Sequence, residues 1–394
     1  MTQRYLDFNT NANTSLKYSV VELFAGAGGL ALGLEQAGFE AKAVLEIDKW
    51  ACATLKKNRP EWNVINEDIE VVSKSGIKKY LKDSSEIDLL SGGYPCQSFS
   101  YAGNRLGIED TRGTLFYNYA EILQELKPKV FLAENVKGLV SHDKGRTLKT
   151  MLDVFKSSGY IVYYKVLNAL HYGVAQKRER IFIVGIREDI KNKINKDFEF
   201  PKPYDYRLTL KDILTDVPKS ECAKYNQKKI DVLKHVKPGG CWRDLPEDVA
   251  KEYMKTTYYM SGGRTGIARR LSWDEPGLTV LCSPSQKQTE RCHPQEIRPF
   301  SIRENARIQS FPDNWEFEGT ISQKYKQIGN AVPVNLAKEV GLAIKRYLDN
   351  LEVLNKNKEK LIKNIVYKKR ISNYLHNYSN TSPKRIIRVA LQEV

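Results

Sequence analysis

The sequence predicts an α/β fold, namely a doubly wound and mostly parallel sheet with a smaller, irregular second lobe. Short apolar runs alternate with helical stretches in the first half of the chain, which is the pattern of a parallel sheet. Polar side chains follow several of these runs, where such sheets bind ligands. The alternation stops after Arg187, and residues 188 to about 268 are rich in Lys, Pro and Tyr.

The expected elements follow in chain order. Strands are expected at 18–24, 41–45, 64–65, 87–91, 130–132, 160–167 and 180–185. Helices are expected at 30–36, 49–57, 115–126, 146–157 and, packing back on the sheet, 334–348. Gly38 follows the first helix and suits its left-handed C-cap. A polar turn at 172–177 joins the last two strands.

Length and charge narrow the class of protein. A chain of 394 residues is too long for one simple core and indicates two lobes. A net charge of +16 favours a polyanionic partner, either nucleic acid or an acidic membrane. No apolar run approaches the roughly 18 residues that span a bilayer, and the polar N-terminus carries no signal peptide. We therefore expect a cytoplasmic protein that binds nucleic acid.

One cysteine stands in an unusual context. The chain has six cysteines, and no pair has the Cys-x-x-Cys spacing of a zinc or redox site. Cys96 follows Gly92-Gly93-Tyr94-Pro95, in which two glycines permit a sharp turn and the proline restricts φ. This context presents the thiol on a loop, where a cysteine can act as a nucleophile. Taken alone, a cysteine in a chain of this size is more often structural.

A glycine loop and two acids indicate a nucleotide-like ligand. Gly26, Gly28 and Gly29 follow the first strand in a loose G-x-G-x-x-G/A pattern. Glu46 lies 20 residues beyond Gly26, where an acid can bind ribose hydroxyls. Asp68 follows the third strand. The pattern suits a nicotinamide cofactor, a flavin or S-adenosylmethionine, and a glycine turn kept for packing is the alternative.

Charged residues also lie beside two later strands. Glu134, followed by Asn135, comes after the strand at 130–132 and is either a buried general acid or a helix-capping anion. Arg178 and Arg180 precede the last strand and alternate onto one face of an extended chain. An ordinary charged turn is the alternative for these arginines.

In their order along the chain, these motifs resemble those of the cytosine-5 DNA methyltransferases of bacterial restriction–modification systems. Tyr94 stands where that family usually has a proline. The resemblance runs from about residue 19 to 347, with a gap in the second lobe. The motifs that carry it are Phe24-Ala25-Gly26-Ala27-Gly28-Gly29, Gly93-Tyr94-Pro95-Cys96-Gln97-Ser98, Ala133-Glu134-Asn135-Val136-Lys137-Gly138 and the segments 176–180, 303–312 and 327–333.

The resemblance implies roles for the catalytic residues. It assigns to Cys96 the addition to carbon 6 of cytosine, and to Glu134 a hydrogen bond or proton to ring nitrogen 3. It places Arg180 near the cytosine carbonyl with Arg178 as its neighbour, and it places Gln97 and Ser98 on a loop that closes over a base flipped out of duplex DNA. The catalytic residues implied by the resemblance are Cys96, Glu134, Arg178 and Arg180.

The resemblance also implies S-adenosylmethionine as methyl donor, without a metal. Phe24 lies against the adenosine or sulfonium region, Glu46 binds the ribose hydroxyls, and Asp68 binds the adenine amino group. Asn330 returns to line the same pocket. The complete set of donor-binding residues is Phe24, Gly26, Gly28, Gly29, Glu46, Asp68, Ile69, Pro95 and Asn330.

Four segments are expected on this basis. They are a catalytic and donor-binding domain (1–187), a smaller target-recognition domain with its hinge (188–325), a returning helix (326–350) and a basic extension (351–394) with ten Lys or Arg and three Glu. The candidates for contact with DNA are Gln97, Ser98, Arg243, Arg264, Arg269 and Arg270. The expected partners are double-stranded DNA with a short recognition site and a cognate endonuclease without direct contact, and a monomer is expected. An RNA (tRNA) cytosine-5 methyltransferase and a catalytically silent DNA-binding protein are the alternatives.

Overall fold

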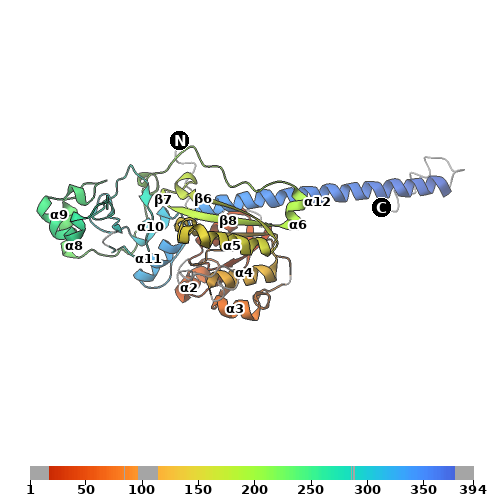
Figure 1. Ribbon diagram of the computed structural model, residues 1–394, viewed down its shortest axis with the longest axis horizontal. Helices are drawn as coiled ribbons and strands as arrows, with labels where there is room; N and C mark the ends of the chain where they lie inside the picture. Colours follow the sequence, from red (N-terminus) through yellow and green to blue (C-terminus); the bar gives the residue numbers. More distant parts are fainter. Residues whose placement is uncertain (1–16, 84, 96–113, 285, 287–288, 378–394) are drawn as a thin grey trace.

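The computed structural model describes residues 17–83, 85–95, 114–284, 286 and 289–377. They form a large lobe built on a sheet and a smaller lobe that contains α8 (Gln227–Lys234) and α9 (Glu247–Met254). Helix α12 (Val334–Asn377) packs along the large lobe and then extends beyond it, on the side away from the smaller lobe (Figure 1).

The large lobe contains a seven-stranded sheet in the order β3-β2-β1-β4-β5-β8-β6. Its strands are β1 (Tyr18–Leu23), β2 (Phe39–Glu46), β3 (Val64–Asn66), β4 (Leu89–Gly92), β5 (Val130–Val136), β6 (Tyr160–Asn168) and β8 (Glu179–Arg187). Strands β1 to β5 pair in parallel, and β8 runs antiparallel to both of its neighbours. The predicted mostly parallel sheet is therefore confirmed.

The strand order indicates where a ligand-binding crevice is expected. Strand β1 lies between β2 and β4, so the direction of winding changes between β1 and β4. In doubly wound sheets, ligands bind outside the carboxyl ends of the strands at this change. The glycine loop follows β1 and the Pro95 segment follows β4, so both predicted site loops begin at the crevice.

Helices cover both faces of the sheet. Apolar side chains of α1 (Gly29–Ala37), α6 (Glu188–Ile194) and α12 share one core with the sheet. Those of α3 (Ile69–Ser75), α4 (Leu115–Leu126) and α5 (Arg146–Ser157) form the core on the other face. Helices α1 and α12 approach closely because Gly33 has no side chain: a Cβ there would lie 2.4 Å from that of Ala337.

Helix α12 begins at Val334, as expected, but does not end near residue 348. Leu351 is the last of its side chains in the core, and Leu354, Leu361 and Ile365 are exposed. The helix continues because the sequence beyond Leu351 is rich in Lys, Leu and Asn and has no Pro or Gly before Asn377. No described helix is both long and apolar enough to cross a membrane.

The smaller lobe has little regular structure, as the sequence predicts for residues 188 to 268. Its own core includes Leu233, Tyr253 and Ala268. The predicted polar turn at 172–177 contains β7 (Gln176–Lys177), which pairs with β9 (Gly277–Leu278) and joins the lobes. The remaining helices are α2 (Lys49–Asn58), α7 (Leu210–Ile213), α10 (Ile302–Ile308) and α11 (Ile321–Asn330). Short 3₁₀ turns lie at Ile77–Tyr80, Lys137–Val140, His142–Gly145, Ala169–His171, Trp242–Asp244 and Lys255–Tyr259.

Two parts of the expected 188–325 segment pack with the large lobe. Ile190 and Phe198 belong to a core of the sheet. Phe311 and Trp315 share a third core with Leu55 of α2. The irregular lobe therefore lies between these two contacts, and the assignment of a function to each segment stays a prediction.

Candidate active site

The glycine loop after β1 leaves its backbone accessible at Gly26. Phe24, Gly26 and Gly28 have φ angles of 57°, 54° and 84°. The Gly26 N–H donates to Oε2 of Glu46 over 2.7 Å. A Cβ at Gly26 would have no heavy atom within 4 Å, so there is open space beside the loop at this residue. This arrangement joins two of the predicted donor-binding residues.

Gly28 and Gly29 are required by packing. A Cβ at Gly28 would lie 2.7 Å from Cδ2 of Leu55, and one at Gly29 would lie 2.3 Å from the carbonyl oxygen of Val332. A side chain at Gly29 would therefore require the backbone to move, and one at Gly28 would displace Leu55 and strain a φ of 84°. The packing alternative therefore explains these two glycines, and their contact with the donor stays a prediction.

Two carboxylates lie at the carboxyl edge of the sheet. Glu46 ends β2, and its Oε1 accepts the N–H of Asp48 over 2.8 Å. Burial raises the pKa of Glu46, while the backbone N–H groups of Asp48 and Gly26 lower it. Asp68 caps α3 by accepting the Glu70 N–H over 2.8 Å. Ile69, the first residue of α3, is buried.

Glu134 and Arg180 form an ion pair on neighbouring strands. Strand β5 continues through Glu134 to Val136, beyond the predicted end at 132, because β8 pairs with its full length. The register places Arg180 opposite Val136, diagonal to Glu134 on the same face. Oε1 of Glu134 lies 3.0 Å from Nε of Arg180, and the two side chains are only 11% and 15% exposed.

The carboxyl group of Glu134 is suited to hold a proton. Burial raises its pKa, and the charges of Arg180 and Arg178 lower it. A buried carboxyl with a raised pKa can donate a hydrogen bond or a proton near neutral pH. The general-acid alternative is thereby favoured over helix capping, because Glu134 lies within a strand.

The described start of the Cys96 loop lies against Glu134. A Cβ at Gly93 would be 2.8 Å from Oε2 of Glu134. Nδ2 of Asn135 donates to the carbonyl oxygen of Tyr94 over 2.9 Å. Pro95 is exposed at the end of the described segment. Three predicted site residues follow it and lie outside the described residues, namely Cys96, Gln97 and Ser98.

Asn135 is a site residue that the sequence reasoning did not select. Its amide fixes the backbone two residues before Cys96, and its Oδ1 accepts the N–H of Val136 over 2.8 Å. Its place next to Glu134 in the motif is the signal that pointed to it.

Arg178 differs from Arg180 in its surroundings. It is fully buried between β7 and β8. Nη2 donates to the carbonyl oxygen of Gly329 over 3.1 Å, and Nη1 donates to that of Val280 over 3.4 Å. Burial lowers the pKa of Arg178 to about 9. Arg178 therefore connects the start of β8 with two segments from later in the chain.

Asn330 lies at the end of α11 with an unexpected neighbour. The Cys282 thiol donates to Oδ1 of Asn330 over 2.9 Å. Gly329 permits this approach, because a Cβ there would lie 2.5 Å from the backbone nitrogen of Cys282. The sequence carries no signal for Cys282, since its spacing matches no known cysteine motif.

Two arginines of the smaller lobe form hydrogen bonds with groups of the same lobe. Arg269 pairs with both oxygens of Glu275 at 2.7 Å and also donates to the carbonyl of Gly239. The guanidinium of Arg270 donates to three backbone carbonyls, those of Val236, Pro294 and Gln295. Both arginines hold the lobe together, and their contact with DNA stays a prediction.

Arg243 and Arg264 are in a different position. Arg243 is exposed and lies 5.8 Å from the ring centroid of Trp242, while Arg264 is half-buried with a φ of 42°. Neither forms an ion pair within the described part of the chain. These two guanidiniums therefore remain available to a partner.

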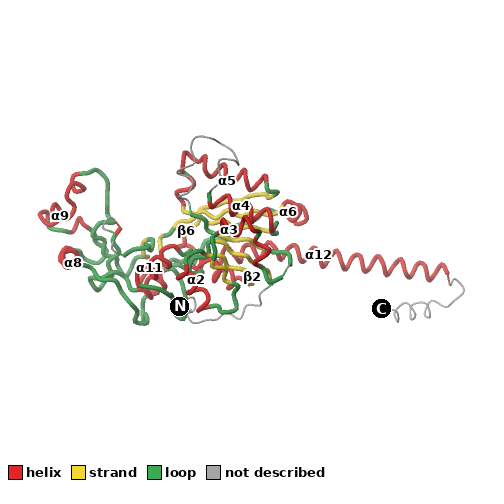
Figure 2. The backbone as a smooth tube through the Cα atoms, turned by 90° about the horizontal axis from the view of Figure 1, so that it is seen from below, coloured by secondary structure: helices red, strands yellow, loops and turns green. Residues whose placement is uncertain are grey.

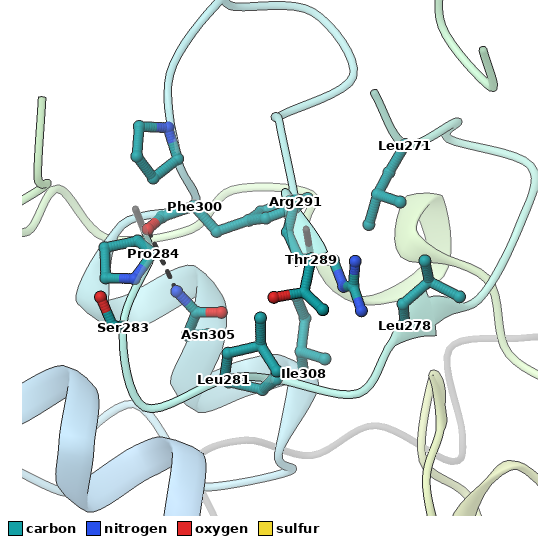
Figure 3. Close-up of a pocket in the computed structure, with 12 residues that line it drawn as sticks. Leu271, Leu278, Leu281, Ser283, Pro284, Thr289, Arg291, Phe300, Asn305 and Ile308 are labelled. Carbon is teal, nitrogen blue, oxygen red and sulfur yellow. Dashed lines mark hydrogen bonds between the residues drawn. The ribbon is translucent and has the colours of Figure 1, made fainter. Parts of the chain in front are cut away.

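A small cavity lies in the smaller lobe between the 278–284 segment and α10 (Figure 3). Its walls are mostly apolar, and Arg291 and Thr289 point toward its interior. None of its lining residues belongs to the predicted catalytic or donor-binding sets. Across the described ranges, no group of three or more His, Cys, Asp or Glu could hold a metal ion.

The sequence pattern of one protein family, C-5 cytosine-specific DNA methylase, matches residues 18–346. The chain belongs to this family. The methylase is 58% identical over 340 residues to the type II methyltransferase M.Sau96I of Staphylococcus aureus, covering 86% of this chain and 78% of that protein. It is 55% identical over 342 residues to the type II methyltransferase M.Eco47II of Escherichia coli, covering 85% and 80%.

A solved structure shares the fold of this methylase. The S. pombe Dnmt2 methyltransferase superposes with a TM-score of 0.56 at 16% identity, covering 85% of this chain and 99% of that one. The methylase is thus an enzyme that acts on carbon 5 of cytosine in DNA, as the order of its motifs indicates.

Proposed function

We propose that this methylase transfers a methyl group from S-adenosylmethionine to carbon 5 of a cytosine flipped out of duplex DNA at a short recognition site. The single observation that carries the proposal is the buried Glu134–Arg180 pair against the start of the Cys96 loop. The type II methyltransferases to which the chain is similar support a role in protecting DNA within a restriction–modification system of a bacterial cytosol. A cognate endonuclease in that system need not touch the methylase.

The residues present fit the donor. The open backbone at Gly26 and the carboxylate of Glu46 face the crevice beyond β1 and β2, with Asp68 after the next strand. In our proposal Phe24, Asp68 and Asn330 complete the set that holds adenosine and its amino acid chain. When bound, the donor supplies an electrophilic methyl group.

The proposed chemistry needs a nucleophile and an acid. The Cys96 thiolate adds to carbon 6 of the cytosine, and Glu134 donates a hydrogen bond or proton to nitrogen 3, so that the ring accepts the electron pair. Carbon 5 then becomes nucleophilic and bonds the methyl group as the methyl–sulfur bond breaks and S-adenosylhomocysteine leaves. The carbon 5 proton passes to solvent, any proton on nitrogen 3 returns to Glu134, and expulsion of Cys96 restores the aromatic ring and the free thiolate.

Arg178 and Arg180 have different parts in this proposal. Arg180 holds Glu134 in place and faces the cytosine carbonyl. Arg178 is a positioning residue, since its guanidinium binds the carbonyls of Gly329 and Val280. It thereby holds the segment that carries Asn330 next to the base pocket.

The smaller lobe, within residues 188–325, reads the DNA in this proposal. Arg243 and Arg264 contact the phosphates or bases, and Gln97 and Ser98 close over the flipped cytosine. Flipping costs a few kcal/mol, which the contacts of both lobes offset.

The test uses two cysteine variants. Cells expressing the wild-type chain are examined by bisulfite sequencing, which reports the modified base and its context. Cys96→Ala is expected to abolish the modification, while the matched control Cys222→Ala retains it, because the Cys222 thiol bonds the carbonyls of Ala223 and Pro299 and touches none of the predicted catalytic residues. Full activity of Cys96→Ala overturns the mechanism, and methyl transfer to tRNA but not to duplex DNA overturns the substrate.

A further inference from the structure

An exposed aromatic cluster lies where the smaller lobe extends past α9. We call Trp242, Tyr258, Tyr259 and Met260 the aromatic tip. Tyr259 exposes 76% of its surface, more than any other large hydrophobic side chain in the described ranges, and Met260 exposes 55%. Large apolar side chains gain free energy when they leave water, so their exposure here favours a partner that covers the tip.

The rings of the tip support one another. The Tyr259 ring stands edge-on to Tyr258, with centroids 5.1 Å apart and planes at 79°. Tyr258 stands edge-on to Trp242 at 5.9 Å and 71°. Nε1 of Trp242 donates to the carbonyl of Gly263 over 3.2 Å, and both inner rings pack on the lobe's own core. The outermost ring is thus held at the surface by a series of contacts from the core.

One cation contacts a ring of the tip, and two others lie near it in the chain. Arg243 lies over the Trp242 ring, and Lys255 and Arg264 flank the tip in the chain. In the part of the chain that the structure describes, none of these three cations forms an ion pair. Lys255 and Arg264 also have positive φ angles, 53° and 42°, which non-glycine residues rarely adopt.

We propose that the aromatic tip is a DNA-contacting surface, in which Tyr259 stacks on a base of the recognition site while Arg243 and Arg264 hold the adjoining phosphates. The inference rests on the proposed function and adds a residue to it. Unpaired cations beside an exposed ring match a polyanion whose base steps can open to admit a large side chain. An apolar protein surface would not need the cations, so duplex DNA is the favoured occupant.

The experiment compares Tyr259→Ala and Tyr259→Phe with a matched control, Tyr164→Ala. Tyr164 is 50% exposed on β6, in the other lobe from α9 (Figure 2). The substrate is a duplex that contains the site identified by bisulfite sequencing, with 2-aminopurine placed at each position in turn. KM for DNA, kcat at saturating DNA and 2-aminopurine fluorescence are measured for each full-length protein, after its folding is checked by circular dichroism.

Tyr259→Ala is expected to raise KM for DNA about 5- to 150-fold, which is the range for losing one base–aromatic stack. Tyr259→Phe and Tyr164→Ala are expected to match the wild type, and one 2-aminopurine position is expected to lose its quenching in Tyr259→Ala alone. Unchanged KM for DNA and unchanged fluorescence in Tyr259→Ala overturn the inference. They do so even if Tyr259→Ala weakens the binding of a protein partner. Wild-type protein that methylates no duplex overturns the proposed function instead.

Discussion

Replacing Arg180 by methionine is expected to make the stability of the protein more sensitive to pH. Met has a similar length and no charge, so Arg180→Met leaves the Glu134 carboxylate buried without its 3.0 Å partner. Burial already raises the pKa of Glu134 above its ordinary value of 4.5, and Arg180 opposes that rise. Without Arg180 the pKa of Glu134 rises further.

The magnitude follows from the charge that is lost. Removing an opposite charge at this distance raises a carboxyl pKa by about 1 to 3, and each unit is worth about 1.4 kcal/mol. A group whose folded pKa is raised loses its stabilising contribution as pH rises through that pKa. At low pH Glu134 is protonated in both proteins, so its charge does not contribute to the difference in the free energy of unfolding. At high pH the buried, unpaired carboxylate destabilises Arg180→Met by about 1.4 to 4 kcal/mol relative to the wild type.

The assay is urea unfolding of both proteins between about pH 5 and pH 9. Burial raises the pKa of Glu22 to about 8, so Glu22 also titrates in this range, but it does so equally in both proteins and cancels in the difference. Arg180→Lys keeps the charge and is expected to show a difference from wild type that does not change with pH. A pH-independent difference for Arg180→Met as well would refute the role assigned to the ion pair.

Three further outcomes are expected. Glu46→Gln removes a carboxylate charge that the Gly26 N–H helps to orient. It is expected to weaken the binding of S-adenosylhomocysteine, measured by calorimetry, about 10- to 100-fold, which is the effect of losing a hydrogen bond to a charged group. Gly29→Ala drives a Cβ to 2.3 Å from the carbonyl of Val332 and is expected to lower the free energy of unfolding by about 1–3 kcal/mol, more than Gly138→Ala, where the nearest heavy atom is 4.0 Å away. Burial raises the pKa of Glu22 from 4.5 to about 8, so the wild type is expected to lose stability as pH rises from about 4.5 to 8 while Glu22→Gln does not, as measured by urea midpoints across that range.

Several elements of the fold and two residues of the site could be predicted from the local sequence pattern. The predicted helix limits at 115–126 and 146–157 coincide with α4 and α5, because apolar periodicity and good helix formers agree there. Glu134 and Arg180 were selected from different motifs, and they form an ion pair. Strand ends were less predictable: β5 extends to Val136 only because β8 pairs with it, which depends on a partner strand more than forty residues away.

The roles of the arginines depended on the fold. Arg178 and Arg180 look alike in the sequence, yet one binds backbone carbonyls and the other a carboxylate. Arg269 and Arg270 were expected at the DNA surface and are bonded to groups of their own lobe. Tyr259 had no signal at all, since exposure of a ring depends on the packing of the whole lobe.

The sequence by itself determined the α/β class, the order of the motifs and the kind of chemistry, because glycine loops, a thiol on a turn and acids after strands carry their information locally. Only the tertiary structure decided which charged groups meet. A guanidinium's role depends on whether a carboxylate, a carbonyl or solvent lies within about 3 Å of it, and those neighbours come from distant parts of the chain.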